Sequence, residues 1–170
     1  MEIKIIIGDI TKIKADAIMV NFFEGMESPD GDIAAVDKAL GGAIAQLIKQ
    51  GEIKGKLNEI TLVHSLGKLP MARVVVVGLG KQAELSTNKI RGAVAETCRW
   101  LRQKSVATIA TTAQGAGINS ISFEDAAQAV TEGALLGLYS FRKHITREED
   151  KLGEIKQFLI IGSDYLGFVL

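Results

Sequence analysis

The sequence has only one cysteine, no long apolar run and no signal-peptide pattern. Cys98 is the one cysteine among 170 residues, so no disulfide can form within the chain. A single cysteine is typical of proteins from a reducing compartment, and we expect a cytoplasmic location. No run approaches the roughly 18 apolar residues that a membrane-spanning helix needs. The opening "MEIKIIIGDI" has an early acidic residue and no long apolar run, so we expect no signal peptide.

An excess of charge of one sign is also missing, because 20 lysine and arginine residues balance 20 aspartate and glutamate residues. Non-specific nucleic-acid binding needs a basic surface, so nucleic acid is not an expected partner. The metal-binding and nucleophile motifs H-E-x-x-H, C-x-x-C and G-x-S-x-G do not occur. We therefore expect no catalytic residue, no metal site and no cofactor in this chain.

What the sequence does contain is a regular alternation of apolar runs and helical periods. Strands are expected at residues 2–7, 15–22, 59–64, 73–78, 106–111 and 157–162. Helices are expected at residues 33–47, 86–104 and 122–142. This order predicts an α/β fold, a three-layer α/β/α sandwich around a mixed, largely parallel six-stranded sheet. With no repeat and no linker, residues 1–170 are expected to form a single domain.

The last expected helix carries a ridge of small side chains. Ala126, Ala129, Gly133 and Gly137 fall on one narrow stripe at about 100° per residue. Glycine inside a helix is about 1 kcal/mol less favourable than alanine, so the stripe needs a reason. Small residues let another backbone approach closely, and we expect this stripe to lie flat on the sheet.

The opposite side of the same helix is mainly polar, but two large side chains interrupt it. Leu135 and Tyr139 lie one turn apart on this side. An isolated exposed leucine needs no explanation, whereas an aligned pair suggests contact with another domain or subunit. The alternative is that the charged segment 143–154 folds back over them.

Several further residues have a structural explanation that we prefer to a catalytic one. The motif "GLGKQA" at 78–83 fits G-x-G-x-x-A, but the next helix is capped later, at Ser86 or Thr87, which favours a tight turn over a dinucleotide site. We interpret His64 as a hydrogen-bonded structural residue and Cys98 as a packed side chain. The helix dipole explains a group of acidic residues better than a metal ion does: Glu24, Glu27, Asp30, Asp32 and Asp37.

Two short segments resemble the start of macro domains, a family that binds ADP-ribose. They are "GDIT" and "ADAIMVN", which are followed by the glycine-bearing "TTAQGAG" at 111–117. The resemblance implies that Asp9 contacts adenine, that Asn21 lies near the distal ribose, and that Gly115 and Gly117 belong to a phosphate loop. Two phenylalanines follow Asn21 where macro domains have small residues, so we expect weak binding of ADP-ribose or none.

A longer resemblance covers most of the chain. "VDKALGGAIAQLIKQGEIKGKLNEITLVHSLGKLPMARVVVVGLGK" and "AVTEGALLGLYSFRKH" are similar to the N-terminal domain of leucyl aminopeptidases, the cytosol aminopeptidase family. That domain has a fold related to macro domains. The resemblance implies a parent enzyme that removes N-terminal residues from peptides, with two zinc or manganese ions in a C-terminal domain. The metal-binding motifs of that domain, "NTDAEGRL" and "DSGG", are absent here.

The resemblance therefore predicts a non-catalytic domain that serves assembly or regulation. Its expected partners are the catalytic domain of the parent and, because the parent family forms hexamers, further copies of the same chain. The alternative is a free-standing macro-like module that binds ADP-ribose or a related nucleotide. In that case Asp9, Asn21, Gly115 and Gly117 would form the binding site.

Overall fold

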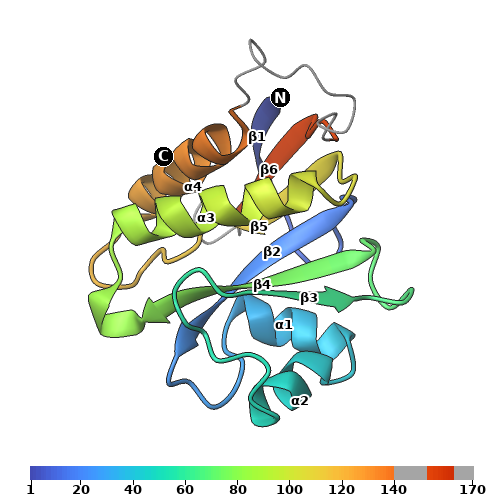
Figure 1. The fold of residues 1–170 in the computed structure, drawn as a ribbon, viewed down its shortest axis with the longest axis vertical. Coiled ribbons are helices and arrows are strands. Elements are labelled where there is room, and N and C mark those ends of the chain that lie inside the picture. Colours follow the sequence, from blue (N-terminus) through green and yellow to red (C-terminus); the bar gives the residue numbers. More distant parts are fainter. Residues whose placement is uncertain (140–152, 163–170) are drawn as a thin grey trace.

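A single twisted sheet of six strands runs through the protein, in the order β1-β6-β5-β2-β4-β3 (Figure 1). The structure is a computed structural model, and it describes residues 1–139 and 153–162. Neighbouring strands are parallel except β3 and β4, which are antiparallel. The strands are β1 (Glu2–Ile7), β2 (Ala17–Glu24), β3 (Ile60–His64), β4 (Arg73–Lys81), β5 (Thr108–Thr112) and β6 (Gln157–Gly162).

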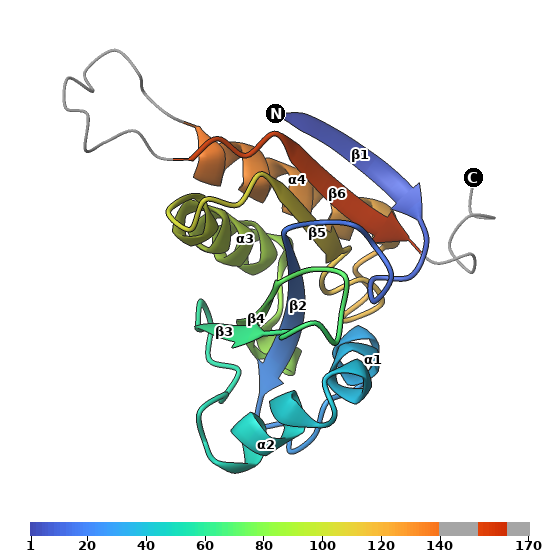
Figure 2. The same ribbon diagram turned by 90° about the vertical axis from the view of Figure 1, so that its right-hand side faces the viewer.

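Helices cover both faces of this sheet (Figure 2). The helices are α1 (Asp32–Ala39), α2 (Ala43–Lys49), α3 (Thr87–Arg102) and α4 (Phe123–Leu138), with a short 3-10 turn, η1 (Gln82–Glu84), before α3. One hydrophobic core joins the sheet to α3 and α4, and the other joins it to α1 and α2. The predicted three-layer α/β/α sandwich with a largely parallel sheet is confirmed.

Strand β4 shows how the sequence builds both cores at once. Val75 and Val77 belong to the core under α3 and α4, while Val74 and Val76 belong to the core under α1 and α2. Successive side chains of a strand point to opposite faces, so a run of four valines suits a strand that is covered on both sides. Within residues 1–139 and 153–162, no helix has the length and apolar character needed to cross a membrane.

The helix expected at 33–47 is in fact two helices. Gly41 and Gly42 separate them, with positive φ angles of 69° and 86° that interrupt the helical path. The buried carboxylate of Asp37, in α1, then caps α2 by accepting hydrogen bonds from the backbone N–H groups of Ile44 (2.7 Å) and Ala45 (3.0 Å). The hydrophobic period continues across the break because both short helices pack on the same core.

The small-residue ridge of α4 packs differently from our expectation. A Cβ atom placed on Gly133 would lie 2.6 Å from the carbonyl oxygen of Arg91, and one on Gly137 would collide with the carbonyl oxygen of Ala95. Both oxygens belong to α3, so the glycines meet the neighbouring helix and the prediction that they lie on the sheet is wrong. Two helices share one face of the sheet, and the glycines let their backbones touch.

The "GLGK" motif is also not the tight turn that we expected. Strand β4 continues through it to Lys81, and a Cβ atom on Gly78 would collide with the carbonyl oxygen of Lys56. The loop around Lys56 crosses the end of β4 there, and Gly80 donates a backbone hydrogen bond of 2.9 Å to Gly55 in that loop. Ser86 caps α3 five residues beyond Lys81, so these glycines do not open a helix as a dinucleotide site requires.

Candidate functional site

Two adjoining hollows open where β1, β2, β5 and β6 end, and we call them together the end cleft. The larger has a volume of about 590 Å³ and the smaller about 260 Å³. Asp32, Thr112, Ala113 and Ala116 line both hollows, so the two form one continuous site. Ligands of open α/β sheets bind at the carboxyl ends of the strands, and the end cleft has this position.

The structure brings the four predicted ligand residues to this cleft. Asp9 and Gly117 line the larger hollow, while Asn21 and Gly115 line the smaller. Asp9 follows β1, Asn21 lies in β2, and the two glycines follow β5, so the parallel order of the sheet gathers them at one edge. Their role in binding remains a prediction.

Asp9 is held in a fixed position by its own loop. Its carboxylate accepts hydrogen bonds from the hydroxyl group of Thr11 (2.7 Å) and from the backbone N–H of Thr11 (2.9 Å). These two hydrogen bonds lower the pKa of Asp9, so its carboxylate is charged at neutral pH. The second carboxylate oxygen has no protein donor within the part of the chain that the structure describes.

Asp32 is a second acidic group of the cleft, and sequence reasoning assigned it to the helix dipole instead. The residue as a whole is exposed, but burial of its carboxyl group raises the pKa of Asp32. The nearby charge of Asp9 raises this pKa further, while a hydrogen bond with Thr112 acts in the opposite direction. Thr112 ends β5, eighty residues later in the chain, so only the folded sheet places it beside Asp32.

The loop after β5 contributes backbone groups to the cleft. Gly115 has a φ of +83°, and a Cβ atom there would lie 2.7 Å from Cδ1 of Ile90. Ala113, Gln114 and Gly115 are buried, and two of them, Ala113 and Gly115, line the cleft. Because glycine has no side chain, Gly115 lines the smaller hollow with its backbone.

The charge of the cleft argues against an anionic ligand. Among the residues that the structure describes, no lysine, arginine or histidine lines either hollow, and the charged side chains there are Asp9, Asp30 and Asp32. A diphosphate would meet carboxylates without a compensating cation. Phe22 and Phe23 also border the smaller hollow, but both are buried, one in each core of the sandwich.

The other candidate residues have no place in the cleft. His64 ends β3 with an exposed side chain that makes no hydrogen bond to another described residue, so our structural interpretation of it is wrong. Cys98 is fully buried, and this burial raises the pKa of its thiol to about 12, which confirms a packed side chain. In the described parts of the chain, no three histidine, cysteine, aspartate or glutamate side chains are grouped closely enough to hold a metal ion.

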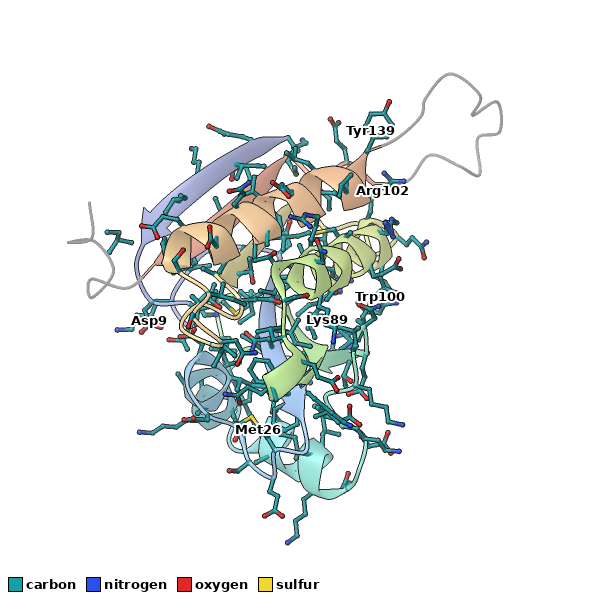
Figure 3. All side chains as sticks on the ribbon, turned by 90° about the vertical axis from the view of Figure 1, so that its left-hand side faces the viewer. Asp9, Met26, Lys89, Trp100, Arg102 and Tyr139 are labelled. Carbon is teal, nitrogen blue, oxygen red and sulfur yellow. The ribbon has the colours of Figure 1, made fainter. Side chains whose placement is uncertain are left out.

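A second feature lies at the far end of α4. Leu135, Leu136 and Tyr139 are 52%, 58% and 72% exposed, and we call them the α4 patch. Figure 3 shows Asp9 near the start of α4 and Tyr139 beyond its other end, directed away from the domain. Leu136 was not in our sequence prediction, because a helical wheel does not show where the neighbouring layer ends. Most of the segment 143–154 lies outside the described residues.

Comparison with known proteins identifies related sequences. The family profile for the cytosol aminopeptidase family, N-terminal domain, matches residues 19–146. A probable cytosol aminopeptidase of Alkaliphilus metalliredigens is 33% identical over 167 residues, which are 98% of this chain and 33% of that protein. Another, of Aquifex aeolicus, is 31% identical over 170 residues, which are 100% of this chain and 33% of that protein. The chain thus spans about a third of the length of these relatives.

Solved structures show where else this fold occurs. A tomato leucine aminopeptidase mutant superimposes with a TM-score of 0.76 and 18% identity, over 95% of this chain and 32% of that one. A Trypanosoma brucei macrodomain superimposes with a TM-score of 0.72 and 13% identity, over 95% of this chain and 62% of that one. The fold is therefore macro-domain-like, as predicted, and at these identities the likeness concerns the fold alone.

Proposed function

The chain belongs to the cytosol aminopeptidase family, in the part that forms its N-terminal domain, and from this premise we propose that it serves assembly or regulation and carries out no chemistry itself. Peptide hydrolysis is then the task of the other two thirds of a protein of the relatives' length. That remainder would hold two divalent ions, zinc or manganese, which activate water and polarise the peptide carbonyl. We also propose a cytoplasmic location for the whole protein.

The described residues of this chain do not fit such a metal centre. Two adjacent ions need several carboxylate or nitrogen ligands converging on one point. The described part of the chain contains no such group of three. We therefore derive no hydrolytic step within this domain.

The α4 patch is the observation that supports a role in assembly. Leu135 and Leu136 lie in the last turn of α4, and Tyr139 follows directly after the end of the helix, so the expected spacing of one helical turn between Leu135 and Tyr139 is not kept. Fully burying one side chain of this size contributes about 1.5–3 kcal/mol, so covering the three would stabilise a contact by several kcal/mol. The partner that we propose is the catalytic part of the aminopeptidase, because the relatives carry about twice this chain's length in addition to it.

A chimera tests this proposal in an assembled enzyme. The N-terminal third of the Alkaliphilus metalliredigens relative would be replaced by this chain, supplied as a separate polypeptide, and its assembly with the remaining two thirds would be measured by analytical ultracentrifugation. We expect Leu135→Ala with Tyr139→Ala to weaken assembly. The matched control, Glu124→Ala with Gln128→Ala, removes two exposed side chains with the same spacing on α4 and should assemble normally. Unchanged assembly of the Leu135 and Tyr139 variant would refute the proposed surface.

Two measurements on the chain by itself complete the test. Truncating side chains on a solvated face usually changes stability by less than about 0.5 kcal/mol, so the Leu135 and Tyr139 variant should melt like the unsubstituted domain. Hydrolysis of leucine p-nitroanilide, assayed with added Zn²⁺ or Mn²⁺, should not be detectable. Metal-dependent turnover that co-purifies with the chain would contradict a non-catalytic role.

A further inference from the structure

Strand β1 forms one outer edge of the sheet (Figure 2). Among the residues that the structure describes, it is hydrogen-bonded to β6 and to no other strand. The backbone N–H groups of Glu2 and Gly8 donate to carbonyl groups at either end of β6, at 2.8 Å and 3.0 Å. In a parallel ladder every second residue bonds to the same neighbour, so the N–H and C=O groups of Ile3, Ile5 and Ile7 point away from β6. A free edge of this kind can pair with a further strand.

Strand β1 lacks most of the features that keep an edge strand from pairing. It contains no proline, and its register with β6 runs without a bulge. Ile5 is 63% exposed, and Met1, directly before the strand, is 45% exposed. Proteins protect an edge with proline, a bulge or charged side chains, and here only the charged side chains of Glu2 and Lys4 are present.

The side chains at the start of β1 separate into an apolar row and a charged row. Ile3 packs against the core under α3 and α4. Successive side chains of a strand point to opposite faces, so Met1 and Ile5 share the face of Ile3. Glu2 and Lys4 lie on the opposite face, where Lys4 Nζ is 3.3 Å from Glu2 Oε1. This segment therefore has an apolar face and a face with one acid and one base.

The same segment is complementary to an antiparallel copy of itself. When Ile3 lies opposite its counterpart in a second copy, Glu2 lies opposite Lys4. In the same register Met1 lies opposite Ile5. Opposite residues of antiparallel strands share a face, so each pair joins apolar with apolar or acid with base. A slip of two residues in either direction would place Glu2 opposite Glu2 or Lys4 opposite Lys4, and like charges directly opposite are destabilising.

We propose that two copies of this chain pair through β1, antiparallel and centred on Ile3, so that two six-stranded sheets join into one. The backbone agrees with this register, because the outward N–H and C=O groups of Ile3 and Ile5 then meet acceptors and donors of the second copy. The contact has a two-fold axis at Ile3, as in the commonest soluble dimers. It involves neither the α4 patch nor the catalytic part of the enzyme, so it goes beyond the proposed function.

Sedimentation of the 170-residue chain, purified with no tag before Met1, tests the pairing. A short strand buries less surface than a standard stable interface, so we expect a reversible equilibrium between monomer and dimer up to millimolar concentration. Hydrogen exchange then identifies the register. The amide hydrogens of Ile3 and Ile5 should become protected as the concentration rises, whereas that of Ile7, which lies beyond the paired segment, should not.

Charge reversal tests the two pairs of Glu2 with Lys4. Glu2→Lys alone, or Lys4→Glu alone, replaces two attractive pairs by two repulsive ones and should weaken the dimer by about tenfold. The double variant restores opposite charges in both pairs, and so does an equimolar mixture of the two single variants, so both should dimerise like the unsubstituted chain. Glu52→Lys and Lys54→Glu are the matched controls, since these exposed residues have the same spacing outside the strands. The melting curve of each variant shows whether it is folded.

Three results would overturn the proposal. The first is sedimentation as a monomer at every concentration, and protected amides of Ile3 and Ile5 in that monomer would assign the edge to a segment of the same chain. The second is a dimer whose affinity is unchanged in both single variants. The third is protection of Ile7, which would require another register. Because neither the α4 patch nor the rest of the enzyme enters these experiments, their outcomes are separate from a failure of the proposed function.

Discussion

The close contact between α3 and α4 predicts that a glycine-to-alanine substitution in α4 destabilises the fold, which is the opposite of the effect expected from helix propensity. Replacing glycine by alanine inside a helix usually stabilises it by about 1 kcal/mol. In Gly137→Ala, however, the new methyl group would collide with the carbonyl oxygen of Ala95 and lie 2.8 Å from its Cα atom. These are backbone atoms of a helix, which cannot move aside as a flexible side chain can.

The expected magnitude follows from the two opposing effects. Overpacking a close contact is destabilising by about 1–3 kcal/mol, and a collision with backbone belongs at the upper end of that range. Subtracting about 1 kcal/mol for helix propensity leaves a net destabilisation of about 2 kcal/mol. For a domain of this size, that lowers the melting temperature by about 4–8 °C.

Gly92→Ala is the matched control on the facing helix. Gly92 is exposed, lies inside α3, and a Cβ atom there would meet nothing within 4 Å. This substitution should raise the melting temperature, because it brings the propensity gain of about 1 kcal/mol without a collision. Both variants would be compared by calorimetry under the same conditions. If Gly137→Ala melted at or above the temperature of the unsubstituted chain, our account of the helix contact would be refuted.

Three further predictions concern buried or acidic side chains. Asp37→Ala should lower the free energy of unfolding by about 1–2 kcal/mol in denaturant titrations, because the N–H of Ile44 loses its buried acceptor; an unchanged midpoint would contradict the cap. Cys98 should resist iodoacetamide in the folded protein and react after unfolding, since its thiol has a pKa of about 12. Burial raises the pKa of Asp32 above its usual 3.8, so the folded state binds the proton more tightly than the unfolded state does. The free energy of unfolding therefore falls as the pH rises from 3.8 through the higher pKa of the folded state. Asp32→Asn should therefore raise the melting temperature at neutral pH and have little effect below pH 3.8; a lower melting temperature at neutral pH would show that the ionised form stabilises the fold.

The glycines show how far the sequence predicts this structure. The helical period predicted a ridge of small residues in α4 that another backbone approaches closely. The structure confirms this, because a Cβ atom added to Gly133 or Gly137 would collide with backbone atoms of α3. Periodicity gives the direction of a face but does not identify the element that covers it. Two helices, α3 and α4, lie side by side on one face of the sheet. The glycines of α4 therefore contact α3, and not the sheet as we predicted.

The break at Gly41 and Gly42 was hidden for a related reason. Ile33, Val36, Leu40 and Ile44 all enter the same core, so the hydrophobic pattern reads as one helix. At the cleft, resemblance named Asp9 and Asn21, but it did not name Asp32. An acidic residue in a first turn is explained by the dipole alone, and its meeting with Thr112 depends on the order of the strands.

The pairing of the first strand with the last has a consequence during synthesis on the ribosome. Among the described residues β1 is paired with β6 alone, in the register Glu2 to Gln157, so it has no strand partner until residue 162 has left the exit tunnel. At roughly 5–20 residues per second this delay lasts on the order of ten seconds. Ile5 and Ile7 remain exposed on this strand even in the folded domain. During the delay, the unpaired β1 can associate with other chains, and we expect a chaperone to shield it.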